Sequence, residues 1–234
     1  MHSTKIPRKY VDWVLRRRGR MEIFERLDLA RTALLVIDMQ NGFLIPGYST
    51  LEVPGLSAIV PNINRLARTC REHDVPVVWT QQTYTEEWRS WFRNFASPEM
   101  RDRIVADTAV GAHGFEIHES LDVAPSDLRV VKRRSSAFTP GASDLHERLQ
   151  DAGRDTLIIT GTLSNVCCEA TARDAMLMNY DTVFVSDANG ARSDEEHVAT
   201  LVNMLQFFAD VRTTDEVARL VETSAAPTPT PTPA

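Results

Sequence analysis

Two cysteines stand side by side in the segment GTLSNVCCEATARD, residues 161–174. A thiol at the start of a helix can act as a nucleophile, because unpaired backbone N–H groups and the helix dipole stabilise its thiolate. Cys167 lies nearer the predicted helix start, and a turn of 100° per residue places it toward the sheet with Thr171 and Met178. Cys168 lies on the flank of that helix, where a small apolar side chain packs. The pattern favours Cys167 as the reactive thiol, with a buried structural thiol as the alternative.

A carboxylate and an amine end two other predicted strands. Asp38 follows the apolar run ALLVI, and Lys132 ends the apolar part of LRVVKR. In an open parallel sheet, ligands bind beyond the carboxyl ends of the strands, so we expect Asp38, Lys132 and Cys167 at one edge. An acid, a base and a nucleophile together form a recognised catalytic combination. Taken singly, each has a structural alternative: a turn-forming aspartate, a lysine in an exposed basic trio, a cysteine in the core.

Short apolar runs alternate with helical patterns along the chain. This alternation predicts an α/β domain with a mainly parallel sheet of about six strands flanked by helices. The predicted strands are 33–37, 75–80, 128–133, 156–161, 182–188 and a short one near Val211. The predicted helices are 56–72, 143–153, 167–179, 194–208 and 214–222. Residues 85–107 are rich in tryptophan and phenylalanine, which predicts short helices or a lid.

Three segments divide the chain. Residues 1–29 are predicted to form an N-terminal arm whose apolar residues dock on the body or on a neighbouring copy. Residues 30–222 form the predicted α/β domain. Residues 223–234, rich in proline and threonine, are predicted to be a disordered tail with polyproline II character.

The composition restricts the function classes. The 234 residues carry a net charge of −6, which argues against a general nucleic-acid or membrane binder. The basic run at 16–20 is interpreted as a solvated face or a subunit contact. Three cysteines, two of them adjacent, do not suit a disulfide framework, so a reducing cytoplasm is expected. The sequence has no signal-peptide pattern and no apolar stretch long enough to span a membrane.

Three motifs, ALLVIDMQNGF, VVKRRSSAF and GTLSNVCCEATARDA, resemble the signatures of the isochorismatase-like cysteine hydrolases. The resemblance spans about residues 30–210 and implies a three-layer, Rossmann-like fold. It implies that Asp38 is the general acid and base, that Lys132 keeps Asp38 ionised, and that Cys167 is the nucleophile. It also implies a cis peptide bond at Thr162–Leu163, with the backbone N–H groups of Leu163 and Cys167 forming an oxyanion hole.

The resemblance implies hydrolysis of a C–N bond in a small amide, carbamoyl or ureido compound, with no cofactor. Family nicotinamidases carry a metal-binding Asp-x-His element where this chain reads GYSTLEVPGLS, so no metal is expected and nicotinamide is a less favoured substrate. Substrate contacts are expected from Phe43, Gln82, Tyr84 and Trp88, with Trp91 beside them. The expected partners are a small-molecule substrate and further copies of the chain in a homodimer or homotetramer.

Three alternatives stay open. A vinyl-ether hydrolase of the isochorismatase type needs the acid but no thiol nucleophile. A binding or assembly module could keep the fold without catalysis, with the arm and the tail serving partners. A dinucleotide-binding site is disfavoured, because no G-x-G-x-x-G sequence follows the first strand.

Overall fold

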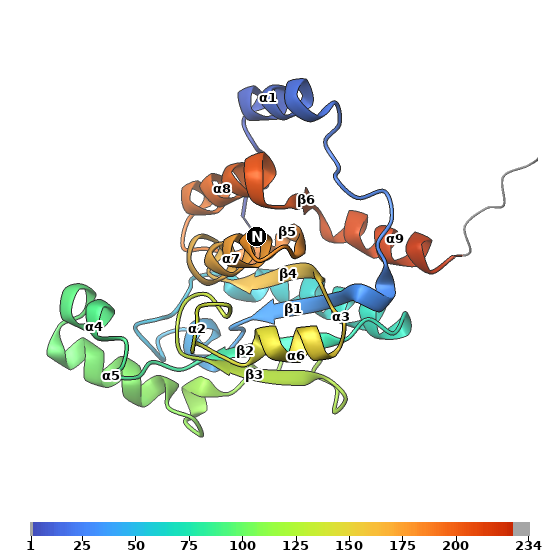
Figure 1. The fold of residues 1–234 in the computed structure, drawn as a ribbon. Helices are drawn as coiled ribbons and strands as arrows, with labels where there is room; N and C mark the ends of the chain where they lie inside the picture. The colour runs from blue at the N-terminus through green and yellow to red at the C-terminus, as the bar shows by residue number, and fades with distance from the viewer. Residues whose placement is uncertain (1, 227–234) are drawn as a thin grey trace, which may run out of the picture.

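A six-stranded sheet runs through the computed structural model, which describes residues 2–226 (Figure 1). Every strand pair is parallel, and the order across the sheet is β3-β2-β1-β4-β5-β6. The strands are β1 (Thr32–Ile37), β2 (Val77–Gln82), β3 (Leu128–Lys132), β4 (Thr156–Thr162), β5 (Asp181–Gly190) and β6 (Asp210–Arg212). The predicted α/β class with a mainly parallel sheet of about six strands is confirmed.

Helices cover both faces of the sheet, so the central strands β1, β2 and β4 are buried along their whole length. The α-helices are α1 (Arg8–Arg18), α2 (Asn41–Leu44), α3 (Val60–Glu72), α4 (Arg89–Phe95), α5 (Pro98–Thr108), α6 (Leu145–Asp151), α7 (Glu169–Leu177), α8 (Asp194–Asn203) and α9 (Thr214–Ala225). Alternate residues of β1 point to opposite faces. Leu34 and Val36 join a core with α3 and α9, whereas Leu35 and Ile37 join a core with α6, α7 and α8.

The segment between β2 and β3 carries α4 and α5, which project beyond the carboxyl ends of the strands (Figure 1). Ser97 caps the start of α5 by accepting a hydrogen bond from the backbone N–H of Met100, and Pro98 suits the first helical turn. The aromatic segment at 85–107 therefore forms two short helices beside the edge where the chemical groups gather.

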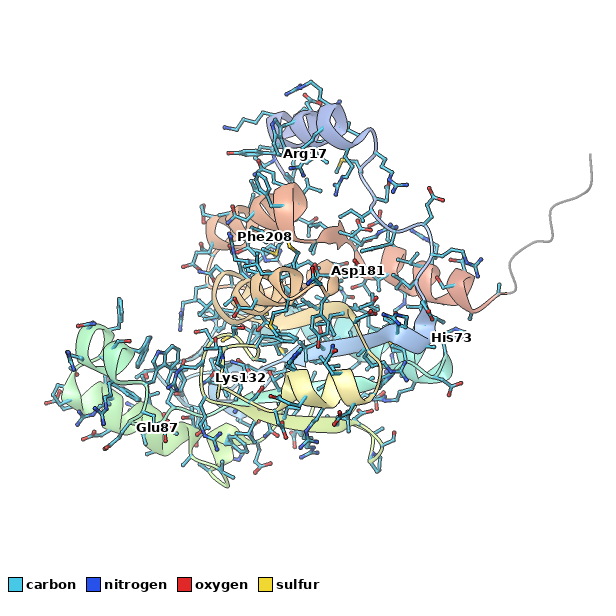
Figure 2. All side chains as sticks on the ribbon, viewed as in Figure 1. Arg17, His73, Glu87, Lys132, Asp181 and Phe208 are labelled. Carbon is cyan, nitrogen blue, oxygen red and sulfur yellow. The ribbon has the colours of Figure 1, made fainter. Side chains whose placement is uncertain are left out.

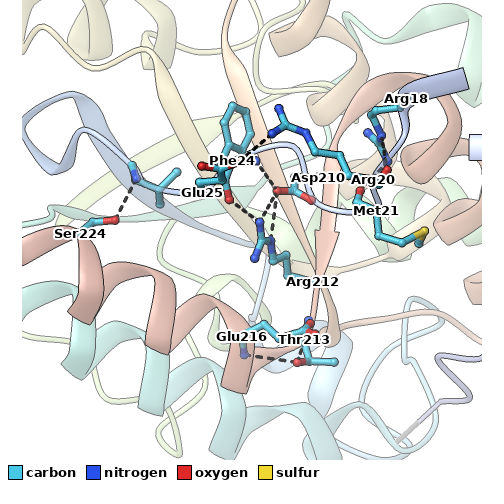
Figure 3. Close-up of polar contacts among 11 residues, drawn as sticks. Arg18, Arg20, Met21, Phe24, Glu25, Asp210, Arg212, Thr213, Glu216 and Ser224 are labelled. Carbon is cyan, nitrogen blue, oxygen red and sulfur yellow. Dashed lines mark hydrogen bonds and ion pairs between the residues drawn. The ribbon is translucent and has the colours of Figure 1, made fainter. Parts of the chain in front are cut away.

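The N-terminal arm packs on the C-terminal half of the domain (Figure 3). The backbone N–H of Phe24 donates to Asp210 at 3.0 Å, and Arg212 donates to the same carboxylate. The guanidinium of Arg17 lies 5.0 Å from the ring centre of Phe207, so part of the basic run packs on an aromatic side chain of the same chain. The arm contacts the body of its own chain, one of the two predicted arrangements.

The C-terminal helix α9 begins with a capping box between Thr213 and Glu216 and continues to Ala225. Residues 223–225, assigned to the tail from the sequence, thus continue this helix. The prediction of a disordered tail otherwise falls on 227–234, outside the described residues. Within residues 2–226, no helix combines the length and apolar character needed to cross a bilayer.

Candidate active site

Asp38, Lys132 and Cys167 meet at the carboxyl edge of the sheet. Asp38 directly follows β1, Lys132 ends β3, and Cys167 lies in the turn between β4 and α7. All three side chains are buried. The Lys132 Nζ lies 2.8 Å from Asp38 Oδ2 and 3.4 Å from Cys167 Sγ. One ammonium group thus contacts both the carboxylate and the thiol.

The backbone at Asp38 adopts a left-handed conformation, with φ at 54°. Aspartate tolerates this region better than most residues. Its Oδ1 accepts a hydrogen bond from the Thr80 hydroxyl at 2.8 Å. Its Oδ2 forms the ion pair with Lys132 and accepts no hydrogen bond from any other residue within 2–226. One oxygen is therefore fixed by Thr80, while the other faces the ammonium.

Two acceptors besides Asp38 and Cys167 surround the Lys132 ammonium, as a buried charge requires. Gln82 Oε1 accepts from Nζ at 2.6 Å, and the backbone oxygen of Arg134 accepts at 3.1 Å. The Gln82 Nε2 donates to the backbone oxygen of Thr83 at 2.7 Å, which fixes the direction of the amide. Both ends of the Gln82 amide are therefore bound within the protein, and its substrate contact stays a prediction.

Burial and neighbouring charges determine the pKa values of Lys132 and Cys167. Burial lowers the pKa of Lys132, but the charge of Asp38 and the proximity of Cys167 raise it more, so the net shift is upward and the ammonium is retained. Burial raises the pKa of Cys167 to about 12, with Lys132 opposing the rise. Burial therefore favours the protonated thiol at neutral pH.

The turn that carries Cys167 is tightly built. Gly161 has φ at 118° and lies against the backbone of Ile37, where a Cβ has no room. The Thr162–Leu163 peptide bond is cis, as expected. A π-helical turn follows at Ser164–Cys168, and the N–H groups of Val166 and Cys168 both donate to the Leu163 oxygen at 3.1 Å. We call residues 161–168 the nucleophile turn. The oxyanion role of the Leu163 and Cys167 N–H groups stays a prediction.

The helix therefore begins differently from the prediction of 167–179, because α7 starts only at Glu169. A π-helical turn changes the angular phase of the residues that follow it. Met178, expected to face the sheet, is 38% exposed, so that expectation is wrong. Cys168 is fully buried with Ala172 and Ala175, as its packing interpretation requires. Burial raises the pKa of Cys168 well above its usual range.

Aromatic side chains from the segment after β2 stand beside the buried groups. Tyr84 stacks on Trp88 with ring centres 5.6 Å apart and contacts Trp91 at 5.1 Å. Burial raises the pKa of Tyr84, and the charges of Cys167 and Asp38 raise it further. We call Tyr84, Trp88 and Trp91 the aromatic wall. Phe43 is buried in the apolar core with residues of α3, and its substrate contact stays a prediction.

The outer side of the wall is held by the segment after β3. The Arg134 guanidinium lies 5.8 Å from the Trp88 ring centre and donates to the backbone oxygen of Glu87 at 3.4 Å. Figure 2 labels Glu87 on this projecting segment and Lys132 at the nearby strand end. The backbone of Arg134 contacts Lys132 while its side chain contacts the wall, so one residue connects the two.

Two residues escaped the sequence reasoning. Thr80 is the first polar residue of β2, and it pairs with Ile37 on β1. A polar residue directly after an apolar run within a strand is the signal that could have identified it. Arg192 follows β5 by two residues and is exposed, and its charge lowers the pKa of Tyr84 against the stronger upward effects. Arg192 therefore lies exposed just beyond the carboxyl end of β5.

Two polar residues near the end of β5 make structural contacts. Asp187 accepts hydrogen bonds from the backbone and hydroxyl of Thr214 at the start of α9. Asn189 donates to backbone oxygens of β4 and β5. Among residues 2–226, no group of three or more His, Cys, Asp or Glu side chains is arranged to hold a metal ion.

Comparison with known proteins identifies the fold and its relatives. A family model described as Isochorismatase domain matches residues 32–216. A probable inactive nicotinamidase of Arabidopsis thaliana is 35% identical over 179 residues, covering 74% of this chain and 87% of that protein. Ureidoacrylate amidohydrolase RutB of Methylobacterium radiotolerans is 31% identical over 200 residues, covering 78% of this chain and 76% of that protein. The crystal structure of a cysteine hydrolase from Pseudomonas syringae pv. phaseolicola matches with a TM-score of 0.77 and 28% identity, covering 88% and 99% of the two chains.

Proposed function

Because the chain belongs to the isochorismatase family, we propose that it is a cysteine-dependent amidohydrolase. It cleaves the C–N bond of a small amide, carbamoyl or ureido compound and releases ammonia or an amine. The observation that carries the proposal is the buried Lys132 ammonium, which contacts the Asp38 carboxylate at 2.8 Å and the Cys167 thiol at 3.4 Å. This arrangement suits a nucleophile that is protonated at rest and loses its proton to a neighbouring base.

Acylation begins with transfer of the thiol proton to Asp38. The sulfur then attacks the carbonyl carbon and forms a C–S bond, and the carbonyl oxygen takes up negative charge. The backbone N–H groups of Leu163 and Cys167 stabilise that oxyanion, and loss of one such donor typically lowers the rate about 100-fold or more. Asp38 returns its proton to the leaving nitrogen as the C–N bond breaks, which leaves a thioester on Cys167.

Deacylation uses the same groups in the reverse sense. Asp38 takes a proton from water, the hydroxide oxygen attacks the thioester carbon, and the C–S bond breaks. The proton returns from Asp38 to the sulfur, so the thiol and the carboxylate are restored. Lys132 keeps its charge throughout, and it stabilises Asp38 as the carboxylate and the sulfur while it carries negative charge.

The surroundings support a planar substrate that bears an anionic group. The aromatic wall offers ring faces on which a planar amide or ureido group can lie. We infer that the exposed Arg192, two residues after the carboxyl end of β5, pairs with a substrate carboxylate, because a guanidinium matches a carboxylate in geometry and charge. The relative from Methylobacterium radiotolerans is named for ureidoacrylate, which combines both features.

The test is ammonia release from a panel of compounds. The panel contains ureido and carbamoyl acids, the same compounds without the carboxylate, nicotinamide and isochorismate. We expect turnover of the ureido or carbamoyl acids, a covalent acyl group on Cys167 in mass spectra of the quenched enzyme, and neither signal in Cys167→Ala. Cys168→Ala, a matched change at the adjacent thiol, retains both signals. Equal ammonia release by Cys167→Ala contradicts the proposal, and isochorismate turnover by that variant favours a vinyl-ether hydrolase.

A further inference from the structure

Two buried polar residues stand behind the nucleophile turn and take no part in the proposed reaction. The Ser164 Oγ lies 2.8 Å from Nδ1 of His197, and Nε2 of His197 lies 2.8 Å from the backbone oxygen of Ser186. Ser164 and His197 are both fully buried. Ser164 belongs to the nucleophile turn, His197 to α8 and Ser186 to β5. The histidine therefore joins the turn to two neighbouring elements.

The two contacts fix the form of the imidazole. A carbonyl oxygen only accepts, so Nε2 carries the hydrogen and donates to Ser186. In the neutral ring, Nδ1 then accepts from the Ser164 hydroxyl. Burial lowers the pKa of His197 to about 4, so the neutral ring is the form present near neutral pH. The Ser164 hydroxyl therefore donates a hydrogen bond to Nδ1 of His197, and this acceptor stays unprotonated near neutral pH.

The position of Ser164 gives this bond its significance. It directly follows Leu163, the expected oxyanion donor, and lies three residues before Cys167. Its backbone oxygen accepts from the N–H of Glu169, the first residue of α7. The hydroxyl bond to His197 adds a side-chain tie from the turn to α8, while Leu163 holds the turn from within through its backbone oxygen.

We propose that His197 is a positioning residue of the nucleophile turn, acting through Ser164 to hold Cys167 and the expected oxyanion donors in register. The proposal rests on the proposed function of Cys167. Small displacements of reacting groups lower rates strongly, by as much as about 100-fold for about 1 Å.

The N-terminal arm completes this arrangement. His2 stacks on His197 with ring centres 5.2 Å apart and planes at 25°. Its Nδ1 lies 2.9 Å from Asp194 Oδ1, and its Nε2 lies 2.9 Å from the backbone oxygen of Ala191. The start of the arm, which precedes α1, thus lies beside the end of β5 (Figure 1). The family model begins at residue 32, so His2 contacts His197 from outside the part of the chain that the model matches.

The experiment compares Ser164→Ala, Ser164→Thr and His2→Ala with the full-length wild type. Tyr180→Phe is the matched control, since the Tyr180 hydroxyl also contacts a histidine, His146, at 2.9 Å but lies next to the start of β5, at the opposite edge of the sheet. The readouts are kcat and KM on the best compound of the panel, the rate of Cys167 alkylation by iodoacetamide, and the thermal unfolding midpoint.

We expect Ser164→Ala to lower kcat about tenfold or more, with KM within about threefold of wild type. We expect its Cys167 to be alkylated about threefold faster, because a loosened turn exposes the thiol. Ser164→Thr keeps the hydroxyl and stays near wild type, and Tyr180→Phe changes only the unfolding midpoint. His2→Ala changes kcat and alkylation in the same directions by about two- to threefold, the size expected for one aromatic contact.

The proposal is overturned if Ser164→Ala loses stability as Tyr180→Phe does but keeps wild-type kcat and alkylation rate. If Ser164→Ala does not fold, His2→Ala, which changes an arm residue, decides in its place: wild-type values there overturn the proposal. Alkylation needs no substrate. A wild type that hydrolyses nothing in the panel therefore refutes the proposed function, while the alkylation ratios still decide the positioning role.

Discussion

The buried Asp38–Lys132 pair and the aromatic wall differ in their burial and in the elements that fix them. Asp38 and Lys132 are fully buried at the ends of strands, and each polar contact on them comes from the sheet or its immediate loops. Tyr84, Trp88 and Trp91 are only half-buried on the projecting segment that contains α4. The proposed function therefore assigns the chemistry to the strand ends and the choice of substrate to the projecting segment.

The consequence is that the two regions respond differently to mutation. A change among the buried groups removes both stability and chemistry, because their charges compensate one another in a medium that solvates them poorly. A change in the wall alters the fit of the substrate and leaves the ion pair intact.

The largest effect is expected at the nucleophile. Cys167→Ala removes the atom that forms the thioester and lowers kcat/KM about 10⁴-fold or more. Cys168→Ala, at a fully buried neighbour, keeps activity within about threefold and lowers the free energy of unfolding by about 1 kcal/mol. Steady-state kinetics and denaturant unfolding measure both. Similar losses of activity in the two variants would remove the distinction between the thiols.

Next in size is the loss of the buried cation. Lys132→Ala leaves the Asp38 carboxylate buried without its ion pair, which lowers the free energy of unfolding by about 3–5 kcal/mol. Arg133→Ala changes the adjacent exposed residue and shifts stability by about 0.5 kcal/mol or less. Urea unfolding followed by circular dichroism gives both values. Equal stabilities of the two variants would show that the buried ion pair between Lys132 and Asp38 does not contribute to the free energy of unfolding.

A third expectation concerns pH. Because the pKa of Cys167 is raised to about 12, its alkylation by a neutral reagent rises about tenfold per pH unit between about pH 8 and pH 10. A plateau near the ordinary thiol pKa of about 8.5 contradicts the burial of the thiol. Peptide mass spectrometry assigns the label to Cys167, separately from Cys168.

The same shift has a consequence for stability. Unfolded thiols lose their protons near pH 8.5, whereas the folded thiols of Cys167 and Cys70, both with the pKa raised to about 12 by burial, keep theirs. The unfolded state therefore binds fewer protons in this interval. The stability contributed by each thiol is complete below about pH 8.5 and falls by about 1.4 kcal/mol per pH unit as pH rises toward 12.

The smallest effect belongs to the wall. Trp88→Ala removes the ring between Tyr84 and Arg134, and we expect KM to rise about tenfold with kcat within about threefold. Phe95→Ala is the matched control, because this aromatic residue of α4 is 73% exposed. Unchanged KM in Trp88→Ala, or an equal rise in Phe95→Ala, would place substrate recognition elsewhere.

Much of the fold was predictable because local patterns settle it. The apolar runs predicted strands that agree with β1 and β4 to within one residue at each end. The errors fall where local and long-range constraints compete. The residues expected to open a helix at 167 instead finish a π-helical turn, since the chain must pass from the close approach of Gly161 to Ile37 into α7. Periodicity assumes a regular helix and cannot register that turn.

For the site, the sequence established the residue types and their places at strand ends. These local patterns were enough to select Asp38, Lys132 and Cys167 as candidates. The tertiary structure decided how they meet. Lys132 lies on β3, two strands from β1, and Gln82 on the intervening β2 pairs with it and orients its ammonium. Strand order, the burial that keeps Cys167 protonated, and the return of His2 to residues 191–197 all depend on contacts between distant segments, which no short stretch of sequence encodes.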